Sequence, residues 1–318
     1  MHVVIGGGSG FIGTALSQAL RARGDTVTVI SRTAGKGRIT WEDVAAGRFP
    51  QCDAVVNLAG KHILDLRRRW TPAYRNEVID SRVNTTTALV NTLNTMEEPP
   101  RVFVSTAGKC FYGTGELGRV RSYPVLHEDS EPMGIDFPAE MVGRWEQAAE
   151  GIDDRRIRHV RLRIGIVLAA VERQTRLGKL WRVGKVRGIL PLMRLPFCLG
   201  AGASFGHGRQ PFPWIHIDDV VGILLHVIDR RDLAGRFNAV APEITDSLGF
   251  SRSLAEHLNR PLRWSVPTWL VKWVVGAERA SILLEGQNVQ PRRTLRSGYR
   301  FRFPQIEAAL DDLIEITL

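Results

Sequence analysis

A glycine-rich segment near the amino terminus places the strongest constraint on the fold. Residues 6–13 read Gly-Gly-Gly-Ser-Gly-Phe-Ile-Gly, after an apolar strand-like run and before a helical pattern that ends near Ala22. The spacing satisfies both GxGxxG and GxxGxxG, and Gly10 and Gly13 belong to both patterns. Glycine permits the tight turn and lets backbone N–H groups at a helix amino terminus approach a phosphate. The segment therefore predicts a dinucleotide-binding strand–turn–helix unit, the alternative being a tight turn that binds nothing.

Apolar runs alternate with helical patterns over the first 163 residues. The runs predicted to form strands span 2–5, 26–30, 54–57, 102–105 and 159–163. Helices are predicted over 11–22 and, after the N-cap Thr71 and the first-turn Pro72, as far as about Met96. Strands that are apolar on both faces and alternate with helices indicate an α/β fold with a Rossmann-type, doubly wound parallel sheet.

Beyond Arg163 the alternation loosens into a mostly helical pattern. One more strand is expected within 231–240, with helices over 219–228, 248–258, 277–284 and 306–313. His216 alternates with apolar neighbours, which predicts a hydrogen-bonded, partly buried ring, with Asp218 or Asp219 capping the next helix. The predicted organisation is a dinucleotide-binding Rossmann domain over 1–168, a basic insertion over 169–194, and remaining sheet elements with a small C-terminal lobe over 195–318.

The charge of the chain is concentrated in the predicted insertion. The 318 residues carry a net charge of +10, and the 26 residues of 169–194 hold seven basic residues against one acid, Glu172. Leu177, Leu180 and Trp181 among these cations suggest a short amphipathic helix that contacts an anionic membrane surface or an acidic protein. A solvated charged insertion over the cleft is the alternative. The chain has no aromatic-stacking module or helix-turn-helix signature, so nucleic acid is not an expected partner.

Cysteine usage and hydropathy restrict the compartment. Cys52, Cys110 and Cys198 are scattered, odd in number and without a CxxC pair, so neither a disulfide framework nor a metal site is predicted. A reducing compartment is expected, either cytoplasm or mitochondrial matrix, without secretion. No uncharged apolar run approaches the ~20 residues of a membrane-spanning helix, and no signal-peptide pattern precedes the first strand.

The end of the second predicted strand selects between the two nicotinamide dinucleotides. An acidic residue there would accept hydrogen bonds from the adenosine ribose and favour NAD. The strand instead ends in Ser31 and Arg32, with Lys36 and Arg38 close behind. A hydroxyl and a cation suit a 2′-phosphate, so NADP(H) is the predicted cofactor, although Arg32 as a solvated loop residue is the alternative.

Further segments complete a family pattern. They are 7–13, 31–32, 38–41, 56–60, 81–82, 145–146, 163–168, 213–219, 237–242 and 283–287. In this order they resemble the atypical extended short-chain dehydrogenase/reductases of the 39U-type epimerase family, over almost the whole chain. Members are usually labelled nucleotide-sugar epimerases, and that label follows the fold without an assigned reaction.

The resemblance implies that 1–168 is an NADP-binding Rossmann domain, that 195–318 includes a small C-terminal substrate lobe, and that a particular set of residues surrounds the cofactor. The implied set is Ser31, Arg32, Leu58, Ala59, Glu77, Arg82 and Arg163. The glycine-rich loop and the small residues that end the third strand extend the predicted site to Gly7, Ser9, Gly10, Phe11, Ile12, Gly13 and Gly60. Glu77 and Arg82 lie five residues apart on the long helix, about 140° around it, and need not share a face.

The catalytic pair of extended short-chain dehydrogenases is missing from the sequence. Those enzymes use a Tyr-x-x-x-Lys helix with a hydroxyl at the end of the fourth strand, so that the tyrosine can act as acid or base. Spacing places Pro138 and Val142 at the tyrosine and lysine positions and Gly108 at the hydroxyl position. Pro138, Val142 and Gly108 cannot transfer a proton.

Substitutes for the missing pair are few. Tyr112, Lys109 and Ser105 are the candidate catalytic residues, with Thr106 as an alternative hydroxyl. The alternative for the first two is that Tyr112 packs under the cofactor and Lys109 faces water.

Two functions are therefore compatible with the sequence. The first is an NADP(H)-binding reductase or epimerase that acts on a small substrate between the sheet edge and the C-terminal lobe. The second is a catalytically silent, NADP(H)-binding accessory subunit that docks through the basic insertion onto a larger assembly, for example a mitochondrial respiratory complex.

Overall fold

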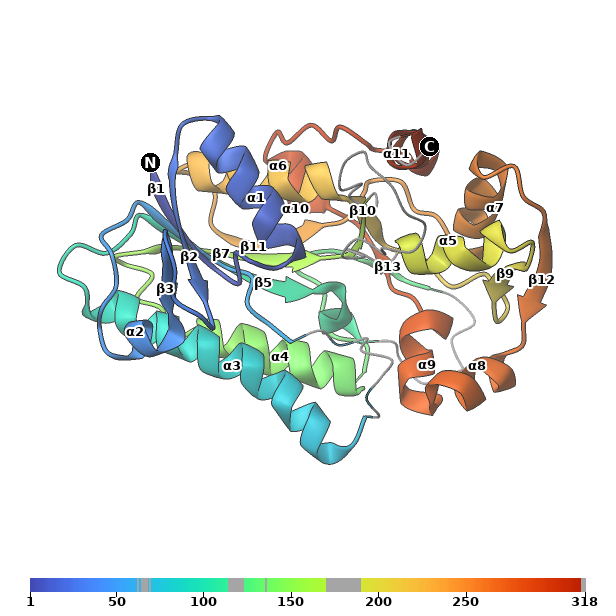
Figure 1. Ribbon diagram of the computed structural model, residues 1–318, viewed down its shortest axis with the longest axis horizontal. Coiled ribbons are helices and arrows are strands. Elements are labelled where there is room, and N and C mark those ends of the chain that lie inside the picture. Colours follow the sequence, from blue (N-terminus) through green and yellow to red (C-terminus); the bar gives the residue numbers. More distant parts are fainter. Residues whose placement is uncertain are drawn as a thin grey trace.

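The structure is a computed structural model of the 318-residue chain (Figure 1). It describes residues 1–61, 63, 68, 70–113, 123–134, 136–169 and 190–315. The predicted basic insertion, including its amphipathic 177–181 pattern, lies outside the described residues except at its two ends.

Seven parallel strands form the central sheet. They are β1 (His2–Gly6), β2 (Thr26–Ser31), β3 (Arg38–Thr40), β4 (Ala54–Asn57), β5 (Val102–Gly108), β7 (Arg158–Ile164) and β11 (Gly235–Ala239). Their order across the sheet is β11-β7-β5-β4-β1-β2-β3. The chain builds outward from β1 in one direction and then from β4 in the other, so the switch point lies between β1 and β4. The predicted Rossmann-type sheet is confirmed.

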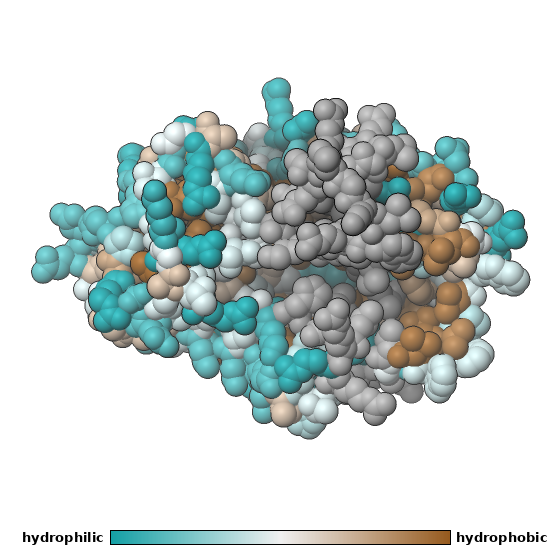
Figure 2. All heavy atoms as spheres, in the orientation of Figure 1, coloured by the Kyte–Doolittle hydropathy of each residue, from teal (hydrophilic) through white to brown (hydrophobic). Residues whose placement is uncertain are grey.

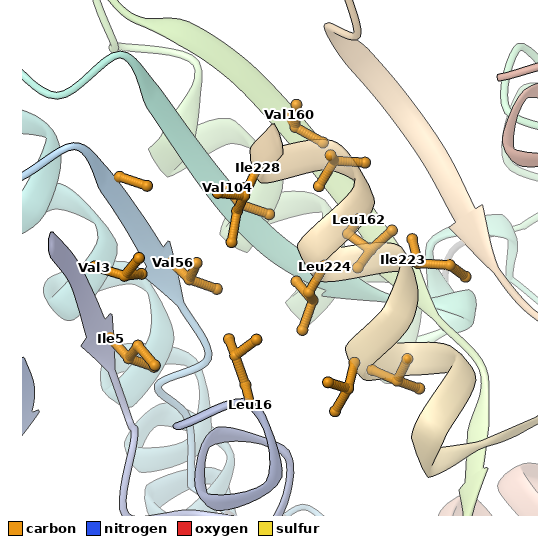
Figure 3. Close-up of a cluster of buried hydrophobic side chains, with 14 of the residues drawn as sticks. Val3, Ile5, Leu16, Val56, Val104, Val160, Leu162, Ile223, Leu224 and Ile228 are labelled. Carbon is orange, nitrogen blue, oxygen red and sulfur yellow. The ribbon is translucent and has the colours of Figure 1, made fainter. Parts of the chain in front are cut away.

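Helices cover both faces of this sheet (Figure 1). One face carries α1 (Phe11–Ala22) and α6 (Ile217–Asp229); the other carries α2 (Trp41–Ala45), α3 (Pro72–Thr95) and α4 (Phe137–Ala149). Leu16 and Leu224, from α1 and α6, face the strand residues Val56 and Val104 in the first core layer (Figure 3). The central strands β1, β4 and β5 are buried on both sides, as their continuous apolar runs predict, whereas the edge strand β3 is partly exposed.

Outside the central sheet, the described residues form three short parallel strand pairs and six further helices, most of them in the C-terminal lobe. The pairs are β6 (Val125–Leu126) with β13 (Asn288–Val289), β8 (Ile166–Leu168) with β10 (Trp214–His216), and β9 (Gly202–Phe205) with β12 (Leu262–Val266). The helices are α5 (Leu190–Cys198), α7 (Ser247–His257), α8 (Thr268–Val275), α9 (Ala277–Leu284), α10 (Arg292–Arg296) and α11 (Ile306–Glu315). A separate core containing Trp214, Phe250 and Leu310 holds much of this lobe together. All four C-terminal helices predicted from the sequence are present.

The expected cap of α6 is wrong. The cap is His216 itself, whose Nδ1 accepts a hydrogen bond from the Asp218 backbone N–H at 3.1 Å. Asp219 is completely buried and instead accepts hydrogen bonds from the backbone N–H groups of Arg302 (2.8 Å) and Phe303 (2.9 Å). It anchors the segment that leads into α11, a long-range role that a local capping rule does not capture.

Two simpler expectations can be compared with the structure directly. Cys52, Cys110 and Cys198 all carry free thiols, in agreement with the predicted absence of a disulfide framework. Across the described ranges, none of the helices combines the length and the apolar character needed to cross a membrane.

Candidate cofactor site at the carboxyl edge of the sheet

The glycine-rich loop connects β1 to α1 and folds back tightly on itself. Gly7 has a φ of +73°, and the Gly10 N–H donates to the Gly7 carbonyl at 2.9 Å. A Cβ on Gly13 would lie 2.5 Å from that same carbonyl oxygen, closer than side chains tolerate. Gly13 therefore lets the helix approach the turn, while Gly7 supplies a backbone conformation that L-residues rarely adopt.

The amino terminus of α1 differs from those of its neighbours in the sheet domain. Thr40, Thr71 and Asp136 cap α2, α3 and α4 with side-chain oxygens. By contrast, α1 begins at the N-cap Gly10, and within the described part of the chain no side chain caps it and no acid lies in its first turn. Its amide groups and the positive end of its dipole are thus available to an anion.

The residues predicted to select NADP(H) lie beside this loop. Ser31 ends β2, is largely buried, and donates a hydrogen bond to the Thr33 carbonyl at 2.5 Å. Arg32 follows it on the surface and forms no ion pair with any residue that the structure describes. Since β2 pairs directly with β1, Arg32 lies at the edge from which the glycine-rich loop also emerges.

A hydrogen-bonded network shapes the end of β4, where Leu58, Ala59 and Gly60 follow. The Asn57 side chain accepts from the Ala59 N–H at 3.1 Å and donates to Thr86 Oγ1 at 2.9 Å. Trp145 Nε1 donates to the same hydroxyl at 3.1 Å. The network fixes the chain beside Gly7, because a Cβ at Gly7 would lie 2.8 Å from the Leu58 carbonyl oxygen.

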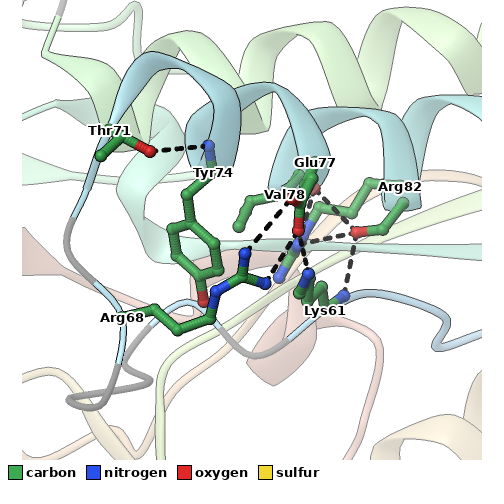
Figure 4. Close-up of polar contacts among 8 residues, drawn as sticks. Lys61, Arg68, Thr71, Tyr74, Glu77, Val78 and Arg82 are labelled. Atoms are coloured by element: carbon green, nitrogen blue, oxygen red, sulfur yellow. Dashed lines mark hydrogen bonds and ion pairs between the residues drawn. The ribbon is translucent and has the colours of Figure 1, made fainter.

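Glu77 and Arg82 occupy different environments on α3 (Figure 4). Glu77 is exposed and paired with Lys61 and with Arg68, the latter at 3.0 Å, and these partners lower the pKa of its carboxyl group. Arg82 is only 8% exposed, and its Nη1 donates to the Val78 carbonyl at 3.0 Å. The expectation that the two need not share a face is consistent with this arrangement.

Arg82 is a buried cation next to the end of β4. Its guanidinium carbon lies 3.0 Å from the position of a Cβ on Gly60 and 5.1 Å from the Trp145 ring. No acidic side chain pairs with it among the described residues, its Nε lacks a hydrogen-bond partner, and burial lowers its pKa to about 10. A buried guanidinium without a carboxylate is costly unless a ligand supplies negative charge.

Arg163 has a structural role that the family pattern does not reveal. Its Nε and Nη2 donate to the two carboxylate oxygens of Glu146 at 2.7 and 2.9 Å, and both side chains are buried. Its Nη1 donates to the Tyr112 hydroxyl at 3.0 Å. The pair ties α4 to β7; a contact between the Arg163 segment and the cofactor stays a prediction.

The positions of the missing catalytic pair lie at the expected edge. Pro138 lies in the first turn of α4, and the buried Val142 follows one turn later. A Cβ on Gly108, at the end of β5, would lie 3.7 Å from Val142 Cγ2. The helix and the strand end therefore meet here, but none of these three side chains can donate or accept a proton.

Protein groups already engage the three candidate catalytic residues. The fully buried Tyr112 donates to Asn238 Oδ1 at 2.8 Å, and burial raises the pKa of its hydroxyl. Lys109 is also buried and donates to Gln287 Oε1 at 2.6 Å, so the expectation that it faces water is wrong. The side chain of Lys109 extends from the end of β5 to Gln287 in the C-terminal lobe. A local sequence pattern cannot predict a partner that lies 178 residues away.

Ser105 forms a buried pair with His159. Ser105 Oγ lies 2.8 Å from His159 Nε2, and burial lowers the pKa of this histidine to about 3. The imidazole is therefore neutral at physiological pH. This pair was not predicted, because the two residues are 54 positions apart.

The sequence also gave no indication of a second buried cation, Arg279 on α9. It is 6% exposed, and its Nε and Nη2 lack hydrogen-bond partners among the described residues. Its guanidinium carbon lies 5.6 Å from the centroid of the Trp70 ring, which in turn packs edge-on against Phe137 at 5.0 Å. Arg279 thus lies near the amino-terminal ends of α3 and α4, at the same edge as Gly108 and Val142.

These features define a Rossmann-type α/β protein of the epimerase/dehydratase architecture. Residues 3–132 match the NAD dependent epimerase/dehydratase family, and residues 266–313 match a domain of unknown function, DUF1731. The chain is 42% identical to the epimerase family protein SDR39U1 of Bos taurus, over 99% of this chain and 100% of the relative. It therefore belongs to the SDR39U1 epimerase family, as the sequence resemblance predicted.

Solved structures agree with this assignment. The crystal structure of human SDR39U1 with NADPH matches with a TM-score of 0.89 and 40% identity, covering 99% of both chains. A nucleoside-diphosphate sugar epimerase from Corynebacterium glutamicum matches with a TM-score of 0.73 and 26% identity, covering 99% of this chain and 58% of that one. A chloroplastic homologue from Arabidopsis thaliana is 30% identical, covering 99% of this chain and 87% of that one.

Proposed function

We propose that this protein is an NADP(H)-dependent reductase or epimerase that acts on a small anionic substrate. The observation that carries the proposal is the amino terminus of α1, which no described side chain caps. The glycine-rich loop leaves its backbone amides accessible to a phosphate, next to Arg32. The NADPH in the human relative supports the same cofactor. When NADP(H) is bound at the glycine-rich loop, its nicotinamide would supply the hydride chemistry. The protein would bind and orient the cofactor and substrate and provide the charges around them.

The described residues fit such a cofactor. Backbone amides at the start of α1 would hold the diphosphate, and Arg32 would pair with the 2′-phosphate. The small residues Ala59 and Gly60 let the backbone approach a ligand at the switch point between β1 and β4. Arg82, buried beside Gly60, would add a positive charge on the same side.

Arg279 supports an anionic substrate. Arg279 lies near an aromatic ring, and no described carboxylate forms an ion pair with it; a ligand that brings an oxyanion would stabilise such a buried guanidinium. Its position near Trp70 and Phe137 places that charge at the end of α4 that faces the C-terminal lobe. We therefore expect a substrate with a carboxylate or phosphate group.

Replacing Arg279 tests the substrate class separately from the cofactor. In the NADPH-loaded protein, Arg279→Met should weaken binding of the probes malonate and inorganic phosphate by about 10-fold or more, because charge-assisted hydrogen bonds contribute about 1.5–3 kcal/mol. NADPH affinity should not change. Titration calorimetry measures the affinities for the probes and for NADPH. The matched control is Arg296→Met, at an exposed position on α10. Equal probe binding by the Arg279 and Arg296 variants would rule out the role of Arg279.

A second candidate function follows from Pro138, Val142 and Gly108. Because these residues cannot transfer protons, a catalytically silent NADP(H)-binding accessory subunit is also supported. An assay with a panel of carbonyl compounds that carry carboxylate or phosphate groups distinguishes the enzyme from the silent subunit. It monitors oxidation of bound NADPH by the loss of its fluorescence. Sustained turnover would exclude the silent subunit. Full NADPH binding without turnover, together with co-purification of a stable assembly, would exclude the enzyme.

A further inference from the structure

An exposed group of tryptophans marks one end of the C-terminal lobe. Trp264 on β12 is 69% exposed, and Trp269 and Trp273 on α8 are 69% and 80% exposed. Val274 beside them is 66% exposed. We call these four residues the tryptophan patch. Tryptophan usually buries most of its ring in a globular protein, so three such exposed rings on consecutive elements are unusual.

The orientation of α8 follows from its packing. Val271 is buried against Ala280 and Leu284 of α9, in a small core that also includes residues of β9 and β12. Trp269 and Trp273 are four residues apart, so they share a helix face, and that face lies away from Val271. The core therefore fixes α8 with its tryptophan face outward.

Neighbouring α5 extends the apolar surface. It packs against β9, the strand that pairs with β12, and it carries the exposed Leu195, while Leu199 follows its end. Figure 2 shows hydrophobic side chains in brown over this end of the molecule, around α5 and α8. Tryptophan lies near the middle of that colour scale, so the brown area marks the aliphatic part of the surface.

The elements that carry the patch and its apolar neighbour α5 bear charges of one sign, and the exposed acid Glu256 of α7 lies beside one of their cations, Arg260. The stretches 190–205 and 258–275, which contain α5, β9, β12 and α8, include four cations and no acid. The cations are Arg194, Arg260, Arg263 and Lys272. The cationic stretch 170–189 leads directly into α5 in the sequence, although its structure is outside the described residues. Apolar and aromatic side chains interleaved with cations complement an anionic surface.

We propose that the tryptophan patch docks this protein on the surface of a membrane that contains anionic lipids. Tryptophan favours the boundary between lipid headgroups and acyl chains, where its ring is apolar and its N–H finds a polar partner. Lysine and arginine beside it are attracted to acidic headgroups, each by about 1 kcal/mol near the surface. The protein would lie on the membrane without spanning it.

The test is co-sedimentation of the NADPH-loaded protein with vesicles. Wild-type protein should bind phosphatidylcholine vesicles that contain phosphatidylserine, bind pure phosphatidylcholine much less, and dissociate as salt is raised. The double substitution Trp269→Ser with Trp273→Ser should weaken binding at least about 10-fold. Leu295→Ser, at an apolar position on α10 that is 46% exposed, is the matched control and should bind like the wild type.

Retained NADPH affinity shows that the variants are folded, independently of vesicle binding. Loss of binding in the Lys272→Glu variant would add support for the electrostatic contribution. Absence of vesicle binding by the wild type would overturn the proposal, as would equal binding by the wild type and the double variant. Concentration-dependent dimerisation that the double variant abolishes, without vesicle binding, would assign the patch to contact between copies of this chain instead.

Discussion

Replacing Glu146 by glutamine is expected to lower the free energy of unfolding by about 3–5 kcal/mol. The substitution leaves the Arg163 guanidinium buried without its carboxylate, although the two pair in bidentate geometry at 2.7 and 2.9 Å. The remaining acceptors, the Tyr112 hydroxyl at 3.0 Å and the Glu128 carbonyl at 3.3 Å, do not neutralise the charge. Chemical denaturation measures the loss.

The same helix provides the control for this prediction. Glu140 on α4 pairs with Arg144 at 2.8 Å, but both side chains are well exposed. Glu140→Gln should therefore cost about 0.5 kcal/mol or less. Equal destabilisation by Glu140→Gln and Glu146→Gln would show that burial does not determine how much the Glu146–Arg163 pair contributes to stability. It would also contradict the conclusion that this pair ties α4 to β7.

Reversing the charge of Arg32 is expected to change the cofactor preference. Arg32→Glu should weaken NADPH binding by about 10- to 100-fold, because it removes a charge-assisted contact with the 2′-phosphate and adds repulsion. NADH affinity should stay the same or rise, since the new carboxylate can accept hydrogen bonds from the ribose hydroxyls. Fluorescence titration of the two reduced nucleotides measures both changes.

Arg231→Glu provides the same charge reversal at the opposite edge of the sheet. Arg231 is exposed and lies between the end of α6 and the start of β11. The Arg231→Glu substitution should leave the affinities for NADPH and NADH unchanged, because Arg231 is far from the loop that follows β1. Unchanged NADPH binding in the Arg32 variant would mean that Arg32 is a solvated loop residue.

Local patterns predicted the elements that position the cofactor site. The bounds of α1 agree with the predicted 11–22 helix, and Thr71 caps α3 through the N–H of Tyr74 at 3.2 Å. Strand ends were less accurate: β5 continues to Gly108, three residues beyond its apolar run, because pairing with β7 supports the extra residues. Helix signals and glycine spacing depend on residues that are close together in the chain, so they can be recognised from the sequence alone.

Side-chain partners were not predictable in the same way. Lys109 meets Gln287 across 178 residues, and Asp219 meets the backbone near Arg302 across 83 residues. Arg279 is buried beside Trp70 although its own helix shows only an ordinary amphipathic pattern. These contacts depend on how the C-terminal lobe folds onto the sheet, and single-sequence periodicity does not encode that placement.

The central claim is that this chain holds NADP(H) at the glycine-rich loop. Its most direct test is the nucleotide carried by the natively purified protein, released by denaturation and identified by mass spectrometry, together with NADPH and NADH affinities of the stripped protein. We predict NADP(H) in the purified protein and NADPH binding at least about 10-fold tighter than NADH binding. Preferential retention of NAD(H), or no binding of either nucleotide by folded protein, would contradict the account.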